Sequence, residues 1–120
     1  MTTLLLLSNN LMFFPRIQMA AGSHVSVIRV SDLDRLDKLI NESDIDFVVV
    51  DLEYDQDFWS NALQVFQENE TLNPKIIAYG PHEDTTSMEI ARSLGCDPVL
   101  AKGAFVNNLK SILAGESKNP

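Results

Sequence analysis

The feature that most constrains this chain is a short apolar run that leads directly into a carboxylate. Phe47 is followed by three valines and then by Asp51, with no polar residue between them. A continuous run rich in β-branched residues predicts a central strand of a parallel sheet, because helices cover both faces of such a strand. Open α/β sheets bind their ligands beyond the carboxyl ends of the strands, so Asp51 stands where this kind of fold places its chemistry. The alternative interpretation is that Asp51 only ends the strand and is hydrated.

The same pattern recurs along the chain. A second wholly apolar run, 4–7, predicts another central strand, and the more mixed alternation over 24–30 predicts an edge strand. Helical patterns separate the expected strands, which cover residues 4–7, 24–30, 47–51, 75–79 and 97–101. Five βα units in register predict a flavodoxin-like (βα)5 three-layer sandwich, with a parallel five-stranded sheet in the order 2-1-3-4-5. We expect a single domain over residues 1–115 and a polar C-terminal tail over 116–120.

The helical spacing of apolar residues predicts which side chains face the core. In the second helix the inward positions are expected to be Leu33, Leu36 and Ile40. Asp57 or Gln56 is expected to cap the third helix, whose buried stripe would be Phe58, Ala62, Val65 and Phe66. Of the neighbours Phe58 and Trp59, one is expected in the core and the other partly exposed. The last helix is expected to end at Gly115 and to bury Phe105, Leu109, Ile112 and Leu113.

Composition limits the partners and the location. Of the 120 residues 45% are apolar, and the formal net charge is −8. An acidic surface repels phosphate backbones and anionic lipids, so we expect no nucleic-acid and no membrane binding; basic partners, or partners that meet a local apolar patch, fit better. No run approaches the roughly eighteen apolar residues that a membrane span needs. The single cysteine, Cys96, excludes an internal disulfide and a cysteine-based zinc cluster, which favours a reducing, cytoplasmic location.

Four short motifs, in order and at matching spacing, resemble the response-regulator receiver domain of two-component signalling. They are Val49-Val50-Asp51-Leu52, Pro74-Lys75-Ile76-Ile77-Ala78, Leu94-Gly95-Cys96-Asp97 and Val99-Leu100-Ala101-Lys102. The resemblance covers residues 3–114 and implies a chemotaxis-receiver-like fold. It also implies the chemistry of that family, which is phosphoryl transfer from a histidine kinase to the aspartate after the third strand.

Three residues match the site of this family by position. Asp51 matches the phosphoacceptor, and Lys102 matches the lysine that pairs with the phosphate. Glu53 falls where a backbone carbonyl binds the magnesium ion of the family. The resemblance therefore implies that Asp51 and Lys102 lie at one site beyond the sheet.

Other positions depart from the pattern of the family. Ser8 and Asn9 stand in place of the two acidic residues that hold magnesium, and neutral oxygens bind Mg²⁺ weakly. Tyr79 replaces the small hydroxyl residue that contacts the phosphate, and Gly103 replaces the proline after the lysine. These departures indicate an atypical receiver, or pseudo-receiver, with no cofactor beyond a weak magnesium site at Asp51 and Glu53.

Our first hypothesis is a stand-alone response-regulator-like signal transduction protein that is not an enzyme. It acts as a protein-interaction module with little or no regulated phosphorylation, and Asp51 and Lys102 form an ion pair over the sheet. Its partners are other signalling proteins, which would meet the fourth helix, fifth strand and fifth helix as in the resembled family, and the chain is a monomer or a weak homodimer. One alternative is a phosphorelay receiver that takes a phosphoryl group on Asp51 from a histidine kinase. A second alternative is a small-ligand binder on a flavodoxin-like scaffold, although no glycine-rich phosphate loop follows residues 4–7.

Overall fold

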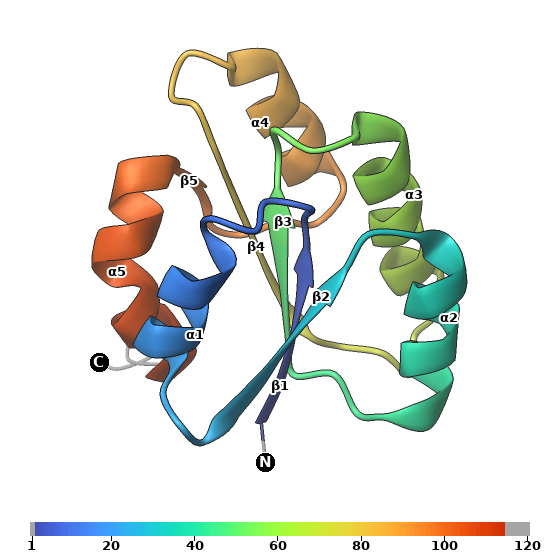
Figure 1. The fold of residues 1–120 in the computed structure, drawn as a ribbon. Coiled ribbons are helices and arrows are strands. Elements are labelled where there is room, and N and C mark those ends of the chain that lie inside the picture. Colours follow the sequence, from blue (N-terminus) through green and yellow to red (C-terminus); the bar gives the residue numbers. More distant parts are fainter. Residues whose placement is uncertain (1, 115–120) are drawn as a thin grey trace, which may run out of the picture.

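Five parallel strands alternate with five helices in the computed structural model, which describes residues 2–114 (Figure 1). The strands are β1 (Thr2–Leu7), β2 (Val25–Val30), β3 (Phe47–Asp51), β4 (Lys75–Gly80) and β5 (Val99–Ala101). The helices are α1 (Phe14–Ala21), α2 (Leu33–Glu42), α3 (Gln56–Glu68), α4 (Thr85–Ser93) and α5 (Lys102–Ala114). The sheet order is β2-β1-β3-β4-β5, which confirms the predicted fold class and places β2 at an edge. The expected end of the last helix at Gly115, the domain boundary there and the tail over 116–120 lie outside the described residues.

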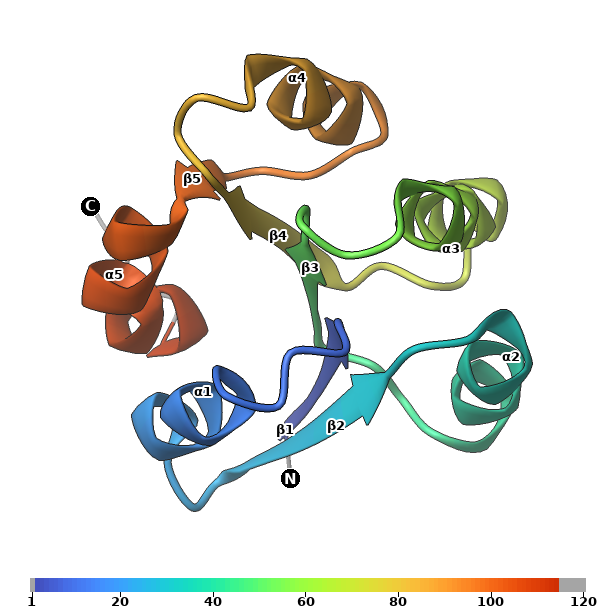
Figure 2. The same cartoon turned by 45° about the horizontal axis from the view of Figure 1, so that its top comes forward.

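The helices form two layers, one on each side of the sheet. Figure 2 shows α1 and α5 on one side and α2, α3 and α4 on the other. Successive side chains of a strand point to opposite faces, so each central strand supplies both cores. The core under α1 and α5 includes Leu4, Leu6, Val49, Ile77 and Tyr79. The core under the other three helices includes Leu5, Leu7, Val48, Val50 and Ala78.

Local signals explain where most helices begin and end. Pro15 lies in the first turn of α1, where its missing N–H costs nothing, and Gly22 ends this helix with φ 85°. The Asp32 carboxylate accepts a hydrogen bond from the Arg35 N–H and caps α2. The Asp84 carboxylate caps α4 in the same way. These short-range contacts fix the ends of the helices, and hence the loops beyond the strands.

The predicted cap of α3 was wrong. Asp55 is the N-cap residue, and its side chain accepts a hydrogen bond from the Asp57 N–H at 3.0 Å. Gln56 and Asp57 already lie inside the first turn, where they present N–H groups that need an acceptor. The prediction that one of Phe58 and Trp59 is partly exposed was also wrong, because both are buried.

Some of the expected core residues lie at the edges of their buried stripes. Leu33 is 40% exposed because it is the first residue of α2, whereas Leu36, one turn further along the helix, is buried. Val65 is only half-buried, since the buried arc of α3 is centred nearer Trp59 and Phe66. Leu113 is likewise half-buried in α5.

None of the helices within residues 2–114 combines the length and the apolar character that crossing a bilayer requires.

Candidate functional site

The last layer of side chains at the carboxyl edge of the sheet contains Ser8, Asp51 and Tyr79. Asp51 and Tyr79 are partners in the register of β3 and β4, and Ser8 follows the last residue of β1. Because side chains alternate along a strand, Asp51 continues the face of Val49, and Tyr79 belongs to the core under α1 and α5. The structure therefore brings together three of the site residues predicted from sequence, on the α1 and α5 side of the sheet.

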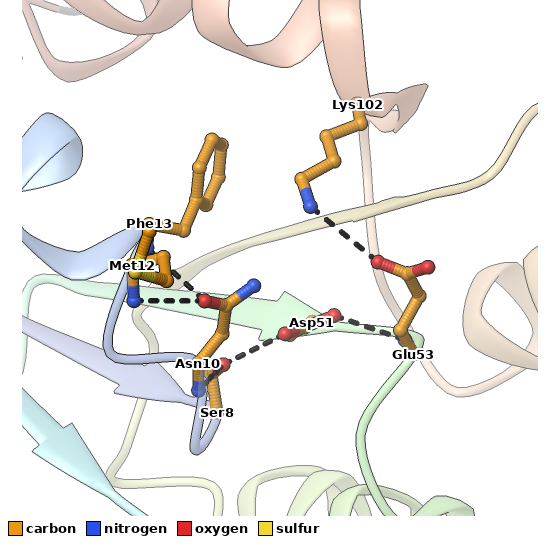
Figure 3. A network of polar contacts seen from close by, with 7 residues as sticks. All are labelled: Ser8, Asn10, Met12, Phe13, Asp51, Glu53 and Lys102. Carbon is orange, nitrogen blue, oxygen red and sulfur yellow. Dashed lines mark hydrogen bonds and ion pairs between the residues drawn. The ribbon is translucent and has the colours of Figure 1, made fainter.

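Asp51 is closed in by the protein. Its side chain is only 3% exposed, and Ser8 is fully buried. The Ser8 hydroxyl donates a hydrogen bond to Oδ2 of Asp51 at 2.7 Å, and the backbone N–H of Glu53 donates to Oδ1 at 2.9 Å (Figure 3). Hydrogen bonds to a carboxylate are roughly twice as strong as neutral ones, and here both oxygens have a donor. The arrangement stabilises a buried carboxylate without a metal or a phosphate.

The polar side chains of the loop between β1 and α1 form hydrogen bonds with other groups of the protein. The Ser8 hydroxyl accepts a hydrogen bond from the Asn10 N–H at 3.0 Å. Oδ1 of Asn10 accepts from the N–H groups of Met12 and Phe13, which shapes the turn before α1 (Figure 3). Asn9 is exposed, and its Oδ1 accepts from Nη1 of Arg29 in β2 at 3.1 Å. The oxygen of Asn9 is therefore engaged at the edge strand.

The predicted ion pair between Asp51 and Lys102 was wrong. Lys102 begins α5 directly after β5, and its Nζ lies 3.5 Å from Oε1 of Glu53 instead. The same ammonium stands 4.8 Å from the centre of the Phe13 ring, a cation–π distance. The physical reason is burial: Asp51 lies below the loop with both oxygens hydrogen-bonded, whereas the carboxylate of Glu53 is 48% exposed and free to turn toward Lys102. An exposed pair of this kind contributes at most about 1 kcal/mol.

Tyr79 fills the place expected for a small hydroxyl residue, and it is fully buried. Its ring stacks on Phe105 with centroids 4.6 Å apart, and the ring of Phe13 lies 5.1 Å away. The hydroxyl lies near Ser8 and Asp51, but within the described residues it forms no hydrogen bond of good geometry. Burial raises the pKa of Tyr79 well above its usual value, and the negative charge of Asp51 raises it further. The phenol is therefore neutral at any physiological pH.

The side chains at this edge do not fit a tightly bound magnesium ion. Mg²⁺ needs octahedral oxygen ligands, of which charged carboxylates bind best. The buried carboxylate of Asp51 already accepts one hydrogen bond on each oxygen, and the oxygen of Asn9 is held by Arg29. Among residues 2–114 no three His, Cys, Asp or Glu side chains are placed together to hold a metal ion.

Sequence reasoning missed the contacts that two aromatic residues, Phe13 and Phe105, make at the site. Phe13 contacts both Lys102 and Tyr79, and Phe105 covers Tyr79 from α5. An aromatic residue before a helix is no signal for a contact with a lysine far along the chain. Cys96 is buried, and burial raises the pKa of its thiol to about 12, so the thiol is protonated and packs as a small apolar side chain.

No protein-family model and no curated protein matches the sequence. Among solved structures, the signal receiver domain of a DNA-binding response regulator from Colwellia psychrerythraea is similar, with a TM-score of 0.79, 12% identity, and 99% of this chain and 100% of that chain covered. A response regulator from Thermotoga maritima has a TM-score of 0.77 and 16% identity, with 95% of each chain covered. The phosphorylated cyanobacterial phytochrome response regulator RcpA has a TM-score of 0.73 and 20% identity, with 98% of this chain and 91% of that chain covered. The chain therefore has the fold of a receiver domain over nearly its whole length.

Proposed function

We propose that this chain is a receiver-like signal transduction protein that acts as a protein-interaction module, with little or no regulated phosphorylation. The observation that carries the proposal is the closed state of Asp51. Both of its oxygens accept hydrogen bonds within the protein, and its side chain is 3% exposed. A receiver fold whose acceptor carboxylate is sealed is suited to present a fixed surface to other signalling proteins.

The chemistry of phosphoryl transfer explains why this geometry opposes phosphorylation. The attacking oxygen must lie in line with the leaving group, and positive charge must offset the repulsion between carboxylate and phosphoryl group. Here an attack by Oδ2 of Asp51 would first break its bond to Ser8. Lys102, the cation that would neutralise the charge, already binds Glu53 and the ring of Phe13. Both requirements are unmet in the closed arrangement.

The tight packing of Tyr79 beside Asp51 also supports a fixed state. A switch requires two conformations with different affinities for a ligand. Tyr79 is fully buried, and its ring packs against Phe13 and Phe105. The ring could therefore change position only if one of these two side chains left the core. The aromatic cluster therefore favours a single conformation of the surface around α5.

Labelling with a small phosphodonor tests the proposal. The protein is incubated with phosphoramidate or acetyl phosphate and Mg²⁺, and its intact mass is measured. We expect an unchanged mass, and the matched variant Ser8→Asp with Asn9→Asp is expected to gain a phosphoryl group on Asp51. A stoichiometric gain in the wild type that disappears in Asp51→Asn would contradict the proposal and establish the phosphorelay alternative.

A further inference from the structure

A groove of about 450 Å³ runs between α2 and α3, on the side of the sheet away from Asp51. Both ribbon views show these two helices side by side at that side (Figures 1 and 2). Its volume is in the range of pockets that hold a ligand or an anchoring side chain. The residues that give it its chemical character are Leu33, Leu36, Val65, Asp34, Asp37 and Glu68. We call this surface the α2–α3 groove.

The floor of the α2–α3 groove is apolar surface that the fold leaves uncovered. The helical pattern of the sequence places Leu33 and Val65 in the core, but Leu33 is 40% exposed and Val65 only half-buried. Both line the groove, next to the buried Leu36. Apolar side chains that two adjacent helices share, and that no element of the domain covers, are suited to receive apolar side chains of a partner.

The rim of the groove carries negative charge, and the neighbouring cations of α2, Arg35 and Lys38, do not line the groove. Asp34 and Asp37 come from α2 and Glu68 from α3, and no lysine, arginine or histidine lines the groove. Within the described residues neither Arg35 nor Lys38, the basic residues of α2, forms an ion pair. Glu68 is moreover the last residue of α3, where the helix dipole disfavours a carboxylate. A cation supplied from outside would relieve this local repulsion.

We propose that the α2–α3 groove binds a basic amphipathic helix of a partner protein. Its apolar side chains would contact Leu33 and Val65, above the buried Leu36, and its arginine or lysine side chains would pair with the rim carboxylates. On α3 the lining residues run from Asn61 to Glu68, about two helical turns, which suits anchors spaced three or four residues apart along a bound helix. The inference rests on the proposed function and deepens it, because it names a binding surface and the chemistry of the partner.

Charge decides between this occupant and the others that an apolar groove can take. A second copy of the chain carries the same net charge of −8 and would be repelled by the acidic rim. Nucleic acid is repelled for the same reason. A basic amphipathic helix can place apolar side chains on the apolar floor and cationic side chains beside the acidic rim. The groove is also separate from the surface of α4, β5 and α5, which the resemblance to receivers suggested as the partner face.

The test uses the full chain, labelled with ¹⁵N, and a defined peptide probe. The probe is a blocked peptide of about fourteen residues, in which leucine repeats at helical spacing and arginine occupies the flanking positions. A glutamate-for-arginine peptide and a scrambled peptide of the same composition serve as controls. We expect saturable amide shifts centred on the residues that line the groove, with the first peptide only.

A matched pair of charge variants separates the groove from general attraction to an acidic protein. Asp37→Lys with Glu68→Lys should weaken binding of the basic peptide by about tenfold or more. The control, Glu83→Lys with Glu89→Lys, changes the net charge equally at exposed positions around α4 and should weaken it by less than about twofold. Circular dichroism and the melting temperature verify that both variants are folded.

Several results would overturn the inference. They are shifts that never saturate, shifts centred on α4, β5 and α5, equal weakening by the two charge variants, or a dimer of the free protein that Asp37→Lys with Glu68→Lys dissociates. The labelling experiment on Asp51 is independent of all of them. We expect Asp51→Asn to bind the peptide with unchanged affinity, so a failure of the groove and a failure of the proposed function give different results.

Discussion

Replacing Ser8 by alanine removes the hydroxyl that closes the site from the β1 side. Its bond to the buried carboxylate of Asp51, at 2.7 Å, is worth about 1.5–3 kcal/mol because the acceptor is charged. Its second bond, accepted from the Asn10 N–H, adds about 1 kcal/mol. We therefore expect Ser8→Ala to lower the free energy of unfolding by about 2.5–4 kcal/mol, since the hydroxyl is fully buried and its removal takes a donor from a buried carboxylate oxygen.

Urea unfolding followed by the fluorescence of the single tryptophan, the buried Trp59, measures this loss. At the usual slope for a small domain, the midpoint should fall by about 1–2 M urea. Ser93→Ala is the matched control: its exposed hydroxyl donates to the carbonyl of Ile90, and its removal should cost less than about 0.5 kcal/mol.

A double-mutant cycle identifies the interaction that is lost. If the Ser8 hydroxyl acts through Asp51, the combination with Asp51→Asn should be non-additive by about 1 kcal/mol or more. A Ser8→Ala protein as stable as the wild type, at an unchanged slope, would refute the reasoning that this hydrogen bond stabilises the closed site.

Four further predictions concern single side chains. Tyr79→Phe should stabilise the protein by about 1 kcal/mol, because it removes a buried hydroxyl without a partner, whereas Tyr54→Phe should destabilise it by about 1 kcal/mol through the lost bond to the carbonyl of Ser31. Above about pH 10 the unfolded chain releases the phenol proton of Tyr79 and the folded chain retains it, so stability falls as pH rises, and Tyr79→Phe should reduce that fall in urea unfolding at pH 9 to 11. Lys102→Ala should change the free energy of unfolding by less than about 1 kcal/mol, since its partner Glu53 is exposed; a loss above 2 kcal/mol would reinstate a buried pair. Cys96 should react with a thiol reagent at pH 8 only as fast as the protein opens, because burial raises its pKa to about 12, and rapid labelling of the native protein would contradict this.

The order of the sheet could be predicted because it depends on local patterns. The apolar runs at 4–7 and 47–50 identify the central strands, and alternation with helices leaves few topologies open. The same periodicity places Ser8, Asp51 and Tyr79 at one edge, since each stands at or just beyond the end of a strand. The positions of these three residues follow from the parallel direction of the strands and from the alternation of side chains along each strand.

The contacts of the long side chains could not be predicted in this way. The partner of Lys102 depends on how deeply Asp51 is buried and on where Glu53 turns, which are properties of the packed loop. The exposure of Leu33 depends on how α2 lies against α3, and helical spacing carries no information about that contact. Periodicity describes one element at a time, whereas these features belong to pairs of elements.

The packing of α5 on α1 has a consequence for the order in which the protein folds during synthesis. Phe13 lies at the start of α1 and Phe105 in α5, and both contact Tyr79 of β4. Until α5 leaves the ribosome, only Phe13 and α1 cover Tyr79 and this face of the sheet. The nascent sheet therefore exposes apolar side chains on the α1 side, while α2, α3 and α4 already cover the other side. A chaperone that binds apolar surface would meet the chain at this stage. Arrival of α5 ends that exposure and seals the layer in which Asp51 lies.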